Sequence, residues 1–436
     1  TLQNLLLGLN KLEALELDAT TVPNLECLDV SLNHITMLPD LSGLGSLVGL
    51  TACFNPLEGP PLLPGSLREV DLSGCHLSSF PNCNFDNAEV LLFAANNLSR
   101  AEEIERVVSS AHLLKFFDVS HNPLVTIPRI AADSSSKLEL ICYPIASTRG
   151  SILPSLLSLT SSSSSPSPSK SQLVPIGTSG MIGRRRTMED VVITQPNFFK
   201  DGTTALVAVF DGHGGAQAAK SASNFITAEL ISTLDSALNE PEAIKRCFVE
   251  TYRKANEEVL STVTGLQGTT ALVGIITRKG VHKEGQKLLH VASLGDSRAV
   301  LCREGKAVRI TIDHKATVPT EHDRILDSGG WVTGDDGRVN NLLGLSRAIG
   351  DKELQHLLSV VPDVTTIDIQ PGRDQFVIFA CDGLYEAMSD QTAVRVAAEA
   401  LAMHDNNPVM AALTLRNWAF DSGSGDNISI VVVSFL

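Results

Sequence analysis

The sequence lacks several features that would place it in a special class of protein. Its 8 cysteines show no Cys-x-x-Cys spacing, which argues against a zinc site or a disulfide framework and favours reduced thiols in a cytoplasmic or nuclear protein. It contains no signal peptide and no apolar run long enough to span a bilayer, so we expect no transmembrane segment. Positive charge is scarce, since the net charge is −15. We therefore expect no nucleic-acid partner, although Arg184-Arg185-Arg186 forms one local basic patch.

The length and the changes in composition predict three parts. A chain of 436 residues exceeds what one hydrophobic core usually supports, so we expect at least two domains. Residues 1–150 are repetitive, 151–175 are rich in Ser and Pro, and 176–436 alternate apolar runs with helical patterns. The middle part, with its serine run Ser161–Ser165, cannot bury enough apolar surface to offset its ordering entropy. It is predicted to be a flexible linker, with a phosphorylated regulatory segment as the alternative.

The N-terminal part repeats the pattern Leu-x-x-Leu-x-Leu-x-x-Asn-x-Leu with apolar replacements. Each unit is expected to be a short strand and a return segment, which bury their leucines only against neighbouring units. The start-to-start spacing of 20 to 26 residues falls within the range of about 20–29 that is typical of leucine-rich repeats. The pattern therefore predicts an α/β solenoid of leucine-rich repeats. Its five copies begin at Leu25, Leu47, Leu67, Ala88 and Leu114.

The Asn of the repeat is expected to be structural. Its side chain can satisfy backbone groups in the turn of each coil, which we favour over ligand binding. Degenerate units around residues 12–17 and 138–143 are expected to act as caps. Cys75 takes the Asn position in one coil as a small buried substitute. The other copies carry Asn33, Asn55, Asn96 and Asn122.

The C-terminal part is predicted to be an α+β domain. Many strands with helices in pairs, rather than strict βαβ alternation, favour two packed sheets flanked by helices. The expected strands are 205–210, 270–276, 288–294, 299–303, 364–369, 375–380 and 428–435. The expected helices are 215–236, 241–263, 320–328, 390–402 and 408–422.

Four turns in this part place an Asp at the end of an apolar run. The first of them also places an imidazole on a glycine-rich turn, where a divalent metal would lie beside a proton donor. Taken alone, that turn fits a polar hairpin equally well. A set of ligands rich in oxygen suits a hard cation, whereas zinc prefers His and Cys. The turns are Asp211-Gly212-His213, Gly295-Asp296-Ser297-Arg298, Cys381-Asp382-Gly383 and Gly425-Asp426-Asn427.

Eight motifs follow one another through this part in a family-specific order. They are Gly183-Arg184-Arg185-Arg186-Thr187-Met188-Glu189-Asp190, Asp211-Gly212-His213-Gly214-Gly215, Gly268-Thr269-Thr270-Ala271, Gly295-Asp296-Ser297-Arg298, Asp313-His314-Lys315, Ser346-Arg347-Ala348-Ile349-Gly350-Asp351, Asp382-Gly383 and Asp426-Asn427. The series resembles the metal-dependent serine/threonine protein phosphatases of the PPM (type 2C) family. The resemblance implies a β-sandwich with helices on its outer faces and two Mg²⁺ or Mn²⁺ ions at one end.

By motif position, the resemblance implies which residues hold these ions. Asp211 would bridge both, and Glu189 and the Gly212 carbonyl would complete one site. Asp382 and Asp426 would hold the other ion. Two ions roughly 3.5–4 Å apart acidify a shared water and clamp an in-line displacement at phosphorus, so no covalent enzyme intermediate is needed.

The resemblance also implies roles for five further residues. Arg185 matches the phosphate-binding arginine, and His213 matches the general acid that protonates the departing Ser or Thr oxygen. Asp190 would orient metal-bound water from outside the ligand set. Asp296 and Glu386 align with acidic positions near a third, weaker metal site, where Glu386 stands in place of the commoner Asp.

The combination of repeats and phosphatase resembles PH-domain leucine-rich-repeat phosphatases, fungal adenylyl cyclases that carry a type-2C-like segment, and repeat–phosphatase proteins of protists. We expect hydrolysis of phosphoserine and phosphothreonine in a phosphoprotein substrate, with the repeat array binding a substrate or partner protein. One alternative is an inert phosphatase-like scaffold, against which the complete acidic set argues. The other is a regulatory fragment of a leucine-rich-repeat adenylyl cyclase, which would require further sequence beyond Leu436.

Overall fold

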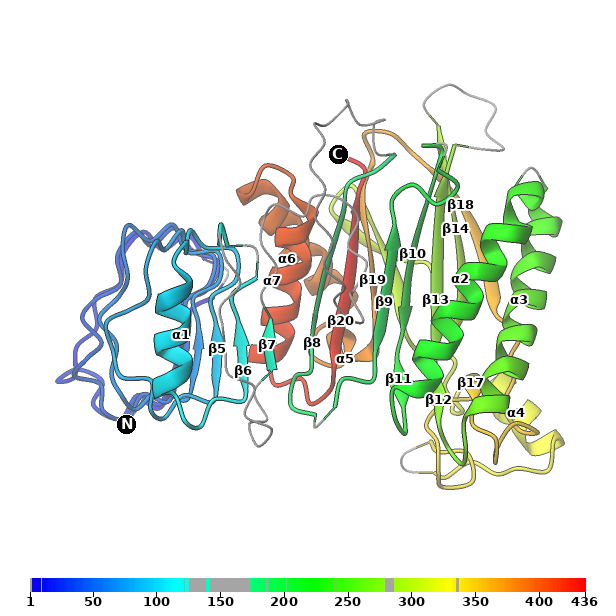
Figure 1. Cartoon of the computed structure of the whole chain (residues 1–436), viewed down its shortest axis with the longest axis horizontal. Coiled ribbons are helices and arrows are strands. Elements are labelled where there is room, and N and C mark those ends of the chain that lie inside the picture. The colour runs from blue at the N-terminus through cyan, green and yellow to red at the C-terminus, as the bar shows by residue number, and fades with distance from the viewer. Residues whose placement is uncertain are drawn as a thin grey trace. The chain divides into compact units, whose positions relative to one another are not determined.

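The computed structural model describes the chain in several stretches (Figure 1). The chain divides into two compact units, Thr1–Ser151 and Ile152–Leu436. Apart from 173–175, the predicted linker lies outside the described residues, as does Arg186. Within the described stretches, no helix is both long enough and apolar enough to cross a membrane. These stretches are residues 2–8, 10–120, 122–124, 139–141, 173–185, 187–200, 202–238, 240–278, 286–334 and 337–436.

Seven short parallel strands form one sheet in the N-terminal unit, in sequence order from β1 to β7. One strand comes from each turn of the chain, so the unit is a solenoid of stacked coils. The central residues of β2 to β6 pair in register: Leu28 with Leu50, Leu50 with Val70, Val70 with Leu91, and Leu91 with Phe117. The strands are β1 (Asn4–Leu6), β2 (Cys27–Asp29), β3 (Gly49–Thr51), β4 (Glu69–Asp71), β5 (Val90–Leu92), β6 (Phe116–Asp118) and β7 (Glu139–Ile141).

The first coil begins earlier than the repeat pattern predicted. Its strand is β1, which pairs with β2, whereas the expected unit at 12–17 forms no strand. Leu12, Leu15 and Leu17 instead pack, partly buried, against the core of the solenoid. The apolar spacing of residues 12–17 correctly predicted that their leucines pack against the core, but the strand expected there is wrong.

The Asn that recurs in the repeat holds neighbouring coils together through hydrogen bonds. Asn55 donates from Nδ2 to the carbonyls of Val30 (2.9 Å) and Ala52 (3.0 Å) and accepts at Oδ1 from the Ile35 amide (3.0 Å). Asn33, Asn96 and Asn122 make the same kinds of bond. The structural role predicted for the four asparagines is confirmed.

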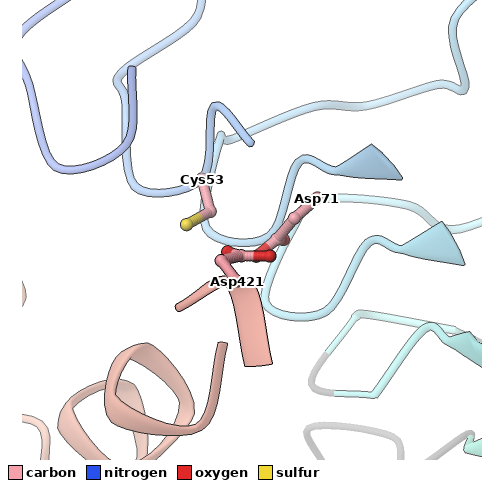
Figure 2. A group of neighbouring side chains, drawn as sticks. All are labelled: Cys53, Asp71 and Asp421. Carbon is pink, nitrogen blue, oxygen red and sulfur yellow. The ribbon is translucent and has the colours of Figure 1, made fainter. Parts of the chain in front are cut away.

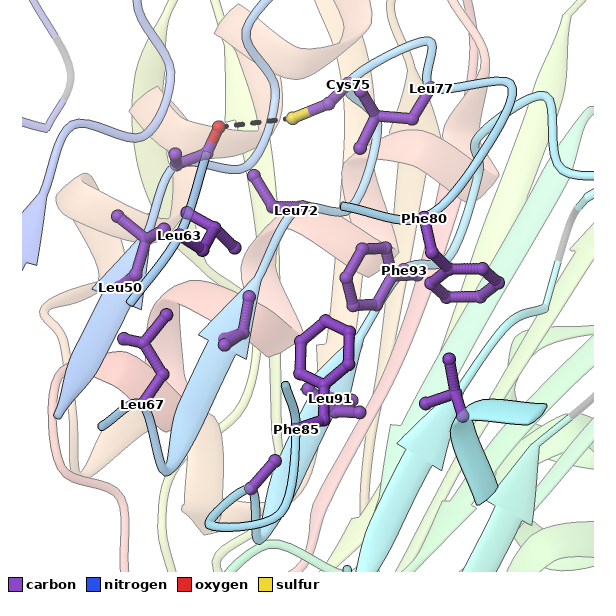
Figure 3. Close-up of a cluster of buried hydrophobic side chains, with 14 of the residues drawn as sticks. Leu50, Leu63, Leu67, Leu72, Cys75, Leu77, Phe80, Phe85, Leu91 and Phe93 are labelled. Atoms are coloured by element: carbon purple, nitrogen blue, oxygen red, sulfur yellow. Dashed lines mark hydrogen bonds between the residues drawn. The ribbon is translucent and has the colours of Figure 1, made fainter. Parts of the chain in front are cut away.

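Cys75 keeps only part of this bonding pattern. Its thiol donates to the Ala52 carbonyl at 3.2 Å (Figure 3). Burial raises the pKa of this thiol to about 12, so it stays protonated as a donor. A thiol lacks the separate carbonyl oxygen with which Asn accepts a hydrogen bond from a backbone amide.

A second repeated element was not foreseen. The Ser73 amide donates to Asp71 Oδ1 at 2.9 Å, directly after β4, and pairs of the same kind follow β2 and β6. Each is an Asx-type turn that satisfies a backbone amide where the strand ends. In the coil before β4, Thr51 and Cys53 occupy the equivalent places, and Figure 2 shows the Cys53 side chain next to Asp71.

Aromatic rings fill the later coils of the solenoid (Figure 3). Phe93 lies 4.8 Å from Phe80 and 6.4 Å from Phe85, measured between ring centroids. The helix α1 (Ala101–Ser110) adds Ile104 and Val107 to the same core. The N-terminal unit therefore has a continuous apolar core of its own.

Two antiparallel five-stranded sheets form the centre of the C-terminal unit, in the orders β18-β14-β13-β10-β9 and β16-β15-β19-β20-β8. Their facing sides share one core, in which Val207, Val209 and Leu272 meet Leu301 and Phe379. The strands are β8 (Ile176–Met181), β9 (Val191–Gln195), β10 (Thr204–Phe210), β13 (Ala271–Thr277), β14 (Lys287–Leu294), β15 (Arg298–Arg303), β16 (Lys306–Arg309), β18 (Asp363–Ile369), β19 (Asp374–Ala380) and β20 (Ile428–Ser434).

Long helices cover the outer faces of both sheets (Figure 1). The helices α2 (Gln217–Ala237) and α3 (Pro241–Thr262) pack on the sheet that contains β10 and β13, through residues such as Ile226 and Phe248. The helices α6 (Asp390–Met403) and α7 (Pro408–Asp421) lie on the other sheet, where α7 contacts β8 and β20. The expected pair of sheets flanked by helices is confirmed.

Short elements gather at one end of this sandwich (Figure 1). A three-stranded sheet, in the order β11-β12-β17, lies near the four-residue helix α5. The helix α4 belongs to a segment with a small core of its own, formed by residues such as Ile325, Leu345 and Leu357. The elements are β11 (Gly212–His213), β12 (Gly268–Thr269), α4 (Pro319–Asp327), β17 (Ile349–Gly350) and α5 (Asp382–Tyr385).

Candidate metal centre and active site

Three carboxylates from separate strands meet at the end of the sandwich. Asp211 follows β10, Asp296 lies in the turn after β14, and Asp382 opens α5 after β19. Both β10 and β14 run antiparallel to β13, which lies between them, so their carboxyl ends reach the same edge. Carboxylate oxygens of the three residues all lie within 4.8 Å of one another. The chain thus concentrates negative charge at one point.

The crowding shifts the protonation of these groups. Burial and the charges of Asp190 and Asp382 raise the pKa of Asp211 well above its ordinary value. Burial, followed by the charges of Asp296 and Glu386, raises the pKa of Asp382 to about 8. Burial raises the pKa of Asp190 to about 6. A cation bound among the carboxylates would oppose these shifts, because an adjacent positive charge favours the ionised form.

The chemistry of the donor set fits Mg²⁺ or Mn²⁺. The three clustered aspartates offer only oxygen ligands, which hard divalent cations prefer. Asp190 Oδ2 is buried and has no hydrogen-bond partner among the described residues. Burial and the adjacent carboxylates raise the pKa of the Cys381 thiol well above its ordinary value, so this neighbour offers no thiolate for a soft metal.

Asn427 organises the loop that carries Glu189. Its Oδ1 accepts from the Glu189 amide (2.8 Å), and its Nδ2 donates to the carbonyls of Ile182 (2.8 Å) and Thr187 (3.0 Å). The Glu189 side chain accepts from the Thr187 hydroxyl at 2.9 Å. One amide at the start of β20 therefore fixes a loop more than two hundred residues earlier.

Two basic side chains contact the acidic cluster. Arg185 Nη2 donates to Asp426 Oδ2 at 2.5 Å, and more than half of the Arg185 side chain remains exposed. Lys315 Nζ lies 3.1 Å from Asp296 Oδ2. Both cations therefore lie at the border between the carboxylates and solvent.

His213 is held by a buried carboxylate. Its Nε2 lies 2.8 Å from Asp351 Oδ1 and 3.0 Å from Oδ2, and the Asp351 side chain is fully buried. A Cβ at Gly268 would lie 2.1 Å from Asp351 Oδ2 and 2.6 Å from His213 Nε2. The pair thus depends on a glycine in the neighbouring strand β12.

Gly212 allows a second close approach. A Cβ at this position would lie 2.4 Å from the Glu189 carbonyl oxygen, so any larger residue would separate the two segments. Since Gly212 also pairs with Thr269 in the small sheet, its backbone is fixed between two neighbours. This geometry brings the Glu189 segment next to Asp211.

A cleft of about 640 Å³ contains almost all the predicted site residues. Asp190 is the exception, because it is buried behind the cleft wall and does not line it. The sequence analysis gave no role to three residues that make contacts in the site: Asn427, Asp351 and Lys315. Each stands in a motif quoted above, but its partner is known only from the fold. The predicted residues that line the cleft are Arg185, Glu189, Asp211, Gly212, His213, Asp296, Asp382, Glu386 and Asp426.

This sandwich, with an acidic cleft at one end, has the architecture and donor set of a metal-dependent phosphatase. The family model of protein phosphatase 2C matches residues 175–428, which is more than half of the chain, and the chain belongs to that family. It is therefore a serine/threonine protein phosphatase whose metal cofactor is Mg²⁺ or Mn²⁺.

Curated relatives match more than half of the chain. Probable protein phosphatase 2C 57 of Oryza sativa subsp. japonica is 35% identical over 270 residues, covering 58% of this chain and 70% of the relative. Protein phosphatase 2C homolog 1 of Schizosaccharomyces pombe is 35% identical over 253 residues (57% and 69%). The Saccharomyces cerevisiae protein of the same name is 32% identical over 258 residues (57% and 88%).

Solved structures agree on the fold. A phosphatase from a pathogenic strain of Toxoplasma gondii is 24% identical, with a TM-score of 0.52, over 60% of this chain and 93% of that one. The serine-threonine phosphatase 2C from Toxoplasma gondii is also 24% identical with a TM-score of 0.52, over 61% and 98%. At this identity the likeness supports the sandwich fold alone.

Proposed function

We propose that residues 176–436 form a PPM-type phosphatase domain that hydrolyses phosphoserine and phosphothreonine in proteins within the acidic cleft. Residues 1–150 form a leucine-rich-repeat domain that recruits the substrate or a partner, and 151–175 connect the two. The observation that carries the catalytic proposal is the cluster of Asp211, Asp296 and Asp382 oxygens within 4.8 Å.

The proposed metal sites use the cleft carboxylates. Asp211, Glu189 and the Gly212 carbonyl would serve one ion, and Asp382 and Asp426 would share the other with Asp211. Two bound divalent ions would lower the pKa of a water molecule and neutralise the charge of the phosphoryl group. Outside this set, Asp190 would orient water, as its raised pKa and unpartnered Oδ2 support. Asp296 and Glu386 would form a third, weaker site.

Arg185 is proposed to bind the phosphate. Its guanidinium lies at the edge of the cleft against Asp426 and remains largely exposed. The planar fork of N–H donors fits two phosphate oxygens at once, which lysine does not. Arg185 would therefore orient the phosphorus for attack from the metal side.

His213 is proposed to protonate the departing serine or threonine oxygen. His213 Nε2 lies 2.8 Å from Asp351 Oδ1. With the ring protonated, Asp351 would accept a hydrogen bond from Nε2, which leaves Nδ1 to deliver the proton. The carboxylate stabilises the charged ring and fixes its orientation. Asp351 is thus a positioning residue for the acid.

The N-terminal unit supports recruitment through its sheet. The flanking residues of β2 and β3 are only half-buried, so this part of the sheet face is open to a partner, whereas β6 is buried throughout. A repeated surface of this kind suits a protein ligand. The described cysteines are all free thiols, which supports a cytoplasmic or nuclear location.

Hydrolysis of a phosphothreonine peptide by the full chain tests the catalytic proposal. Phosphate release with Mg²⁺ or Mn²⁺, its loss in EDTA and its loss in D382N are expected. A folded protein that releases no phosphate with either metal would support the inert scaffold instead.

Deletion of residues 1–150 tests recruitment separately. Small aryl phosphates should still be hydrolysed, because the family match and the cleft lie outside the deleted part. Activity on a phosphoprotein substrate should fall. Equal survival of both activities would rule out recruitment by the repeats.

A further inference from the structure

Lys315 reaches into the acidic cluster as a tethered cation. Its Nζ lies 3.1 Å from Asp296 Oδ2, and the Asp296 side chain is only 8% exposed. Lys315 is the only lysine among the described residues that line the cleft. Its charge also acts on Asp382, whose pKa it lowers against the larger effects of burial and the neighbouring acids. The ammonium therefore acts on two of the three clustered carboxylates.

The backbone next to Lys315 is fixed to the turn that carries Asp296. The His314 amide donates to the Gly295 carbonyl (2.9 Å), and the Gly295 amide donates to His314 Nδ1 (3.1 Å). His314 is 2% exposed, and its Nε2 lies 3.2 Å from Asp363 Oδ2. On the other side, Lys315 forms a β-bridge with Leu345. The contact between the ammonium and the carboxylate is therefore built into the fold and not left to a free surface side chain.

A divalent ion and this ammonium compete for the same Asp296 oxygen. The ammonium occupies Oδ2 by hydrogen bonding, and its charge repels a second cation over the few ångströms across the cluster. The side chain is 45% exposed, and its flexible stem allows the ammonium to leave the carboxylate while the backbone stays in place.

We propose that Lys315 is an internal counter-ion of Asp296 that competes with a divalent cation at the site formed by Asp296, Asp382 and Glu386. Lys315 thereby makes this cation site the weakest of the cleft, and it leaves Asp296 when a cation binds. The inference rests on the cation sites of the proposed function but does not depend on turnover.

A purely structural ion pair makes the opposite prediction. If Lys315 only held the segment before α4 in place, its removal would loosen the cluster and weaken cation binding. If it is a competitor, its removal frees a ligand oxygen and removes a positive charge, so cation binding becomes tighter.

Calorimetric titration of the metal-stripped full chain with MnCl₂ separates the two roles. We expect K315M to tighten the weakest class of Mn²⁺ sites by about tenfold or more, given the strength of a charge interaction at this distance. K315R should bind nearly as the unsubstituted chain does, because it keeps the charge. The matched control K306M removes an exposed lysine from β16 and should change nothing. Unchanged or weaker Mn²⁺ binding by folded K315M would overturn the proposal.

A double-mutant cycle with D296N locates the effect. Without the Asp296 carboxylate, K315M should add much less tightening, because only the longer-range repulsion by the Lys315 charge is left to remove. Undiminished tightening in D296N would refute Asp296 as the partner. K315Q provides the same comparison if K315M does not fold, as judged by circular dichroism.

The titration also separates this proposal from the proposed function. An unsubstituted chain that binds no Mn²⁺ would refute the metal centre and this inference together. Mn²⁺ binding that K315M tightens, in a chain that releases no phosphate, would refute the proposed function alone.

Discussion

Buried polar side chains have hydrogen-bond partners in the solenoid, whereas in the acidic cleft they lie next to groups of the same charge. In the solenoid, Asn55 and Asn96 find backbone donors and acceptors on neighbouring coils. In the cleft, Asp211 and Asp382 face other carboxylates, and their pKa values rise. The polar groups of the solenoid stabilise the free protein, whereas those of the cleft lower its stability until a cation binds.

The largest loss of activity is expected from D382N, which should change activity and metal-free stability in opposite directions. Loss of a carboxylate ligand should reduce phosphothreonine peptide hydrolysis by about 10⁴-fold or more, since the metals supply the nucleophile. In EDTA at pH 8 the same change should raise the melting temperature, because it removes one of the repelling charges. Activity assays and thermal melts of one preparation check both parts.

D323N is the matched control for that substitution. Asp323 lies on α4 with its side chain 79% exposed, so neither activity nor metal-free stability should change measurably. A metal-free D382N protein that melts below the unsubstituted chain would contradict the repulsion argument.

A smaller loss is expected from H213Q, and it should depend on the leaving group. Removal of a general acid should reduce hydrolysis of a phosphothreonine peptide by about 10²–10³-fold. Hydrolysis of p-nitrophenyl phosphate should fall much less, because nitrophenolate leaves without a proton. Steady-state kinetics with both substrates give the ratio.

D351N extends the same test to the positioning residue. We expect a loss of about 10–100-fold with the peptide, as for other partners that orient a reacting group. Equal losses on the two substrates in H213Q would show that His213 serves binding and not proton transfer.

The sequence predicted most of the fold because its helices are long and periodic. The observed α3, α6 and α7 end within one residue of the predicted bounds. In the two five-stranded sheets, the strands β8, β9 and β16 were missed. β8 contains Gly177 and Gly180, β9 is half-buried throughout, and β16 is short and largely exposed, so none shows a buried apolar run.

The sequence also predicted the cleft residues but not their partners. Motif order identified Asp211, Asp382 and His213, which all line the cleft. Asp351 lies 138 positions after His213, and no local pattern indicates such a pairing. Tertiary contacts between distant segments determine these partners, and spacing along the chain carries no information about them.

A moderate loss of stability is expected from N96A in the solenoid. Asn96 accepts from the amides of Cys75 and Leu77 and donates to the Leu72 carbonyl. Leaving these buried groups without partners should lower the free energy of unfolding of this unit by about 2–4 kcal/mol. Urea unfolding followed by far-ultraviolet circular dichroism measures the change.

Fluorescence identifies which unit unfolds. The two tryptophans are Trp331 and Trp418, and both belong to the C-terminal unit, so the fluorescence transition should not move in N96A. The matched control N97A removes an exposed neighbour with one 3.3 Å bond and should cost less than about 0.5 kcal/mol. Equal effects of the two substitutions would argue against a stabilising role for the hydrogen bonds that Asn96 makes between coils.

The smallest expected effect is a pH dependence of the metal-free C-terminal unit. The pKa values of Asp382 (about 8) and Asp190 (about 6) lie above those of the unfolded chain. At these two groups the folded protein therefore binds more protons than the unfolded one between pH 4 and 8. The stability that they contribute is fully present at low pH and is lost as pH rises towards 8. Melts followed by tryptophan fluorescence in EDTA should show that the melting temperature falls by a few degrees between pH 5.5 and 8.

Saturating Mn²⁺ should abolish this fall in melting temperature, because the cation replaces the protons, and D382N should reduce it. A metal-free melting temperature that rises with pH would mean that the carboxylates are stabilised in their charged form, and the contrast with the solenoid would then be lost.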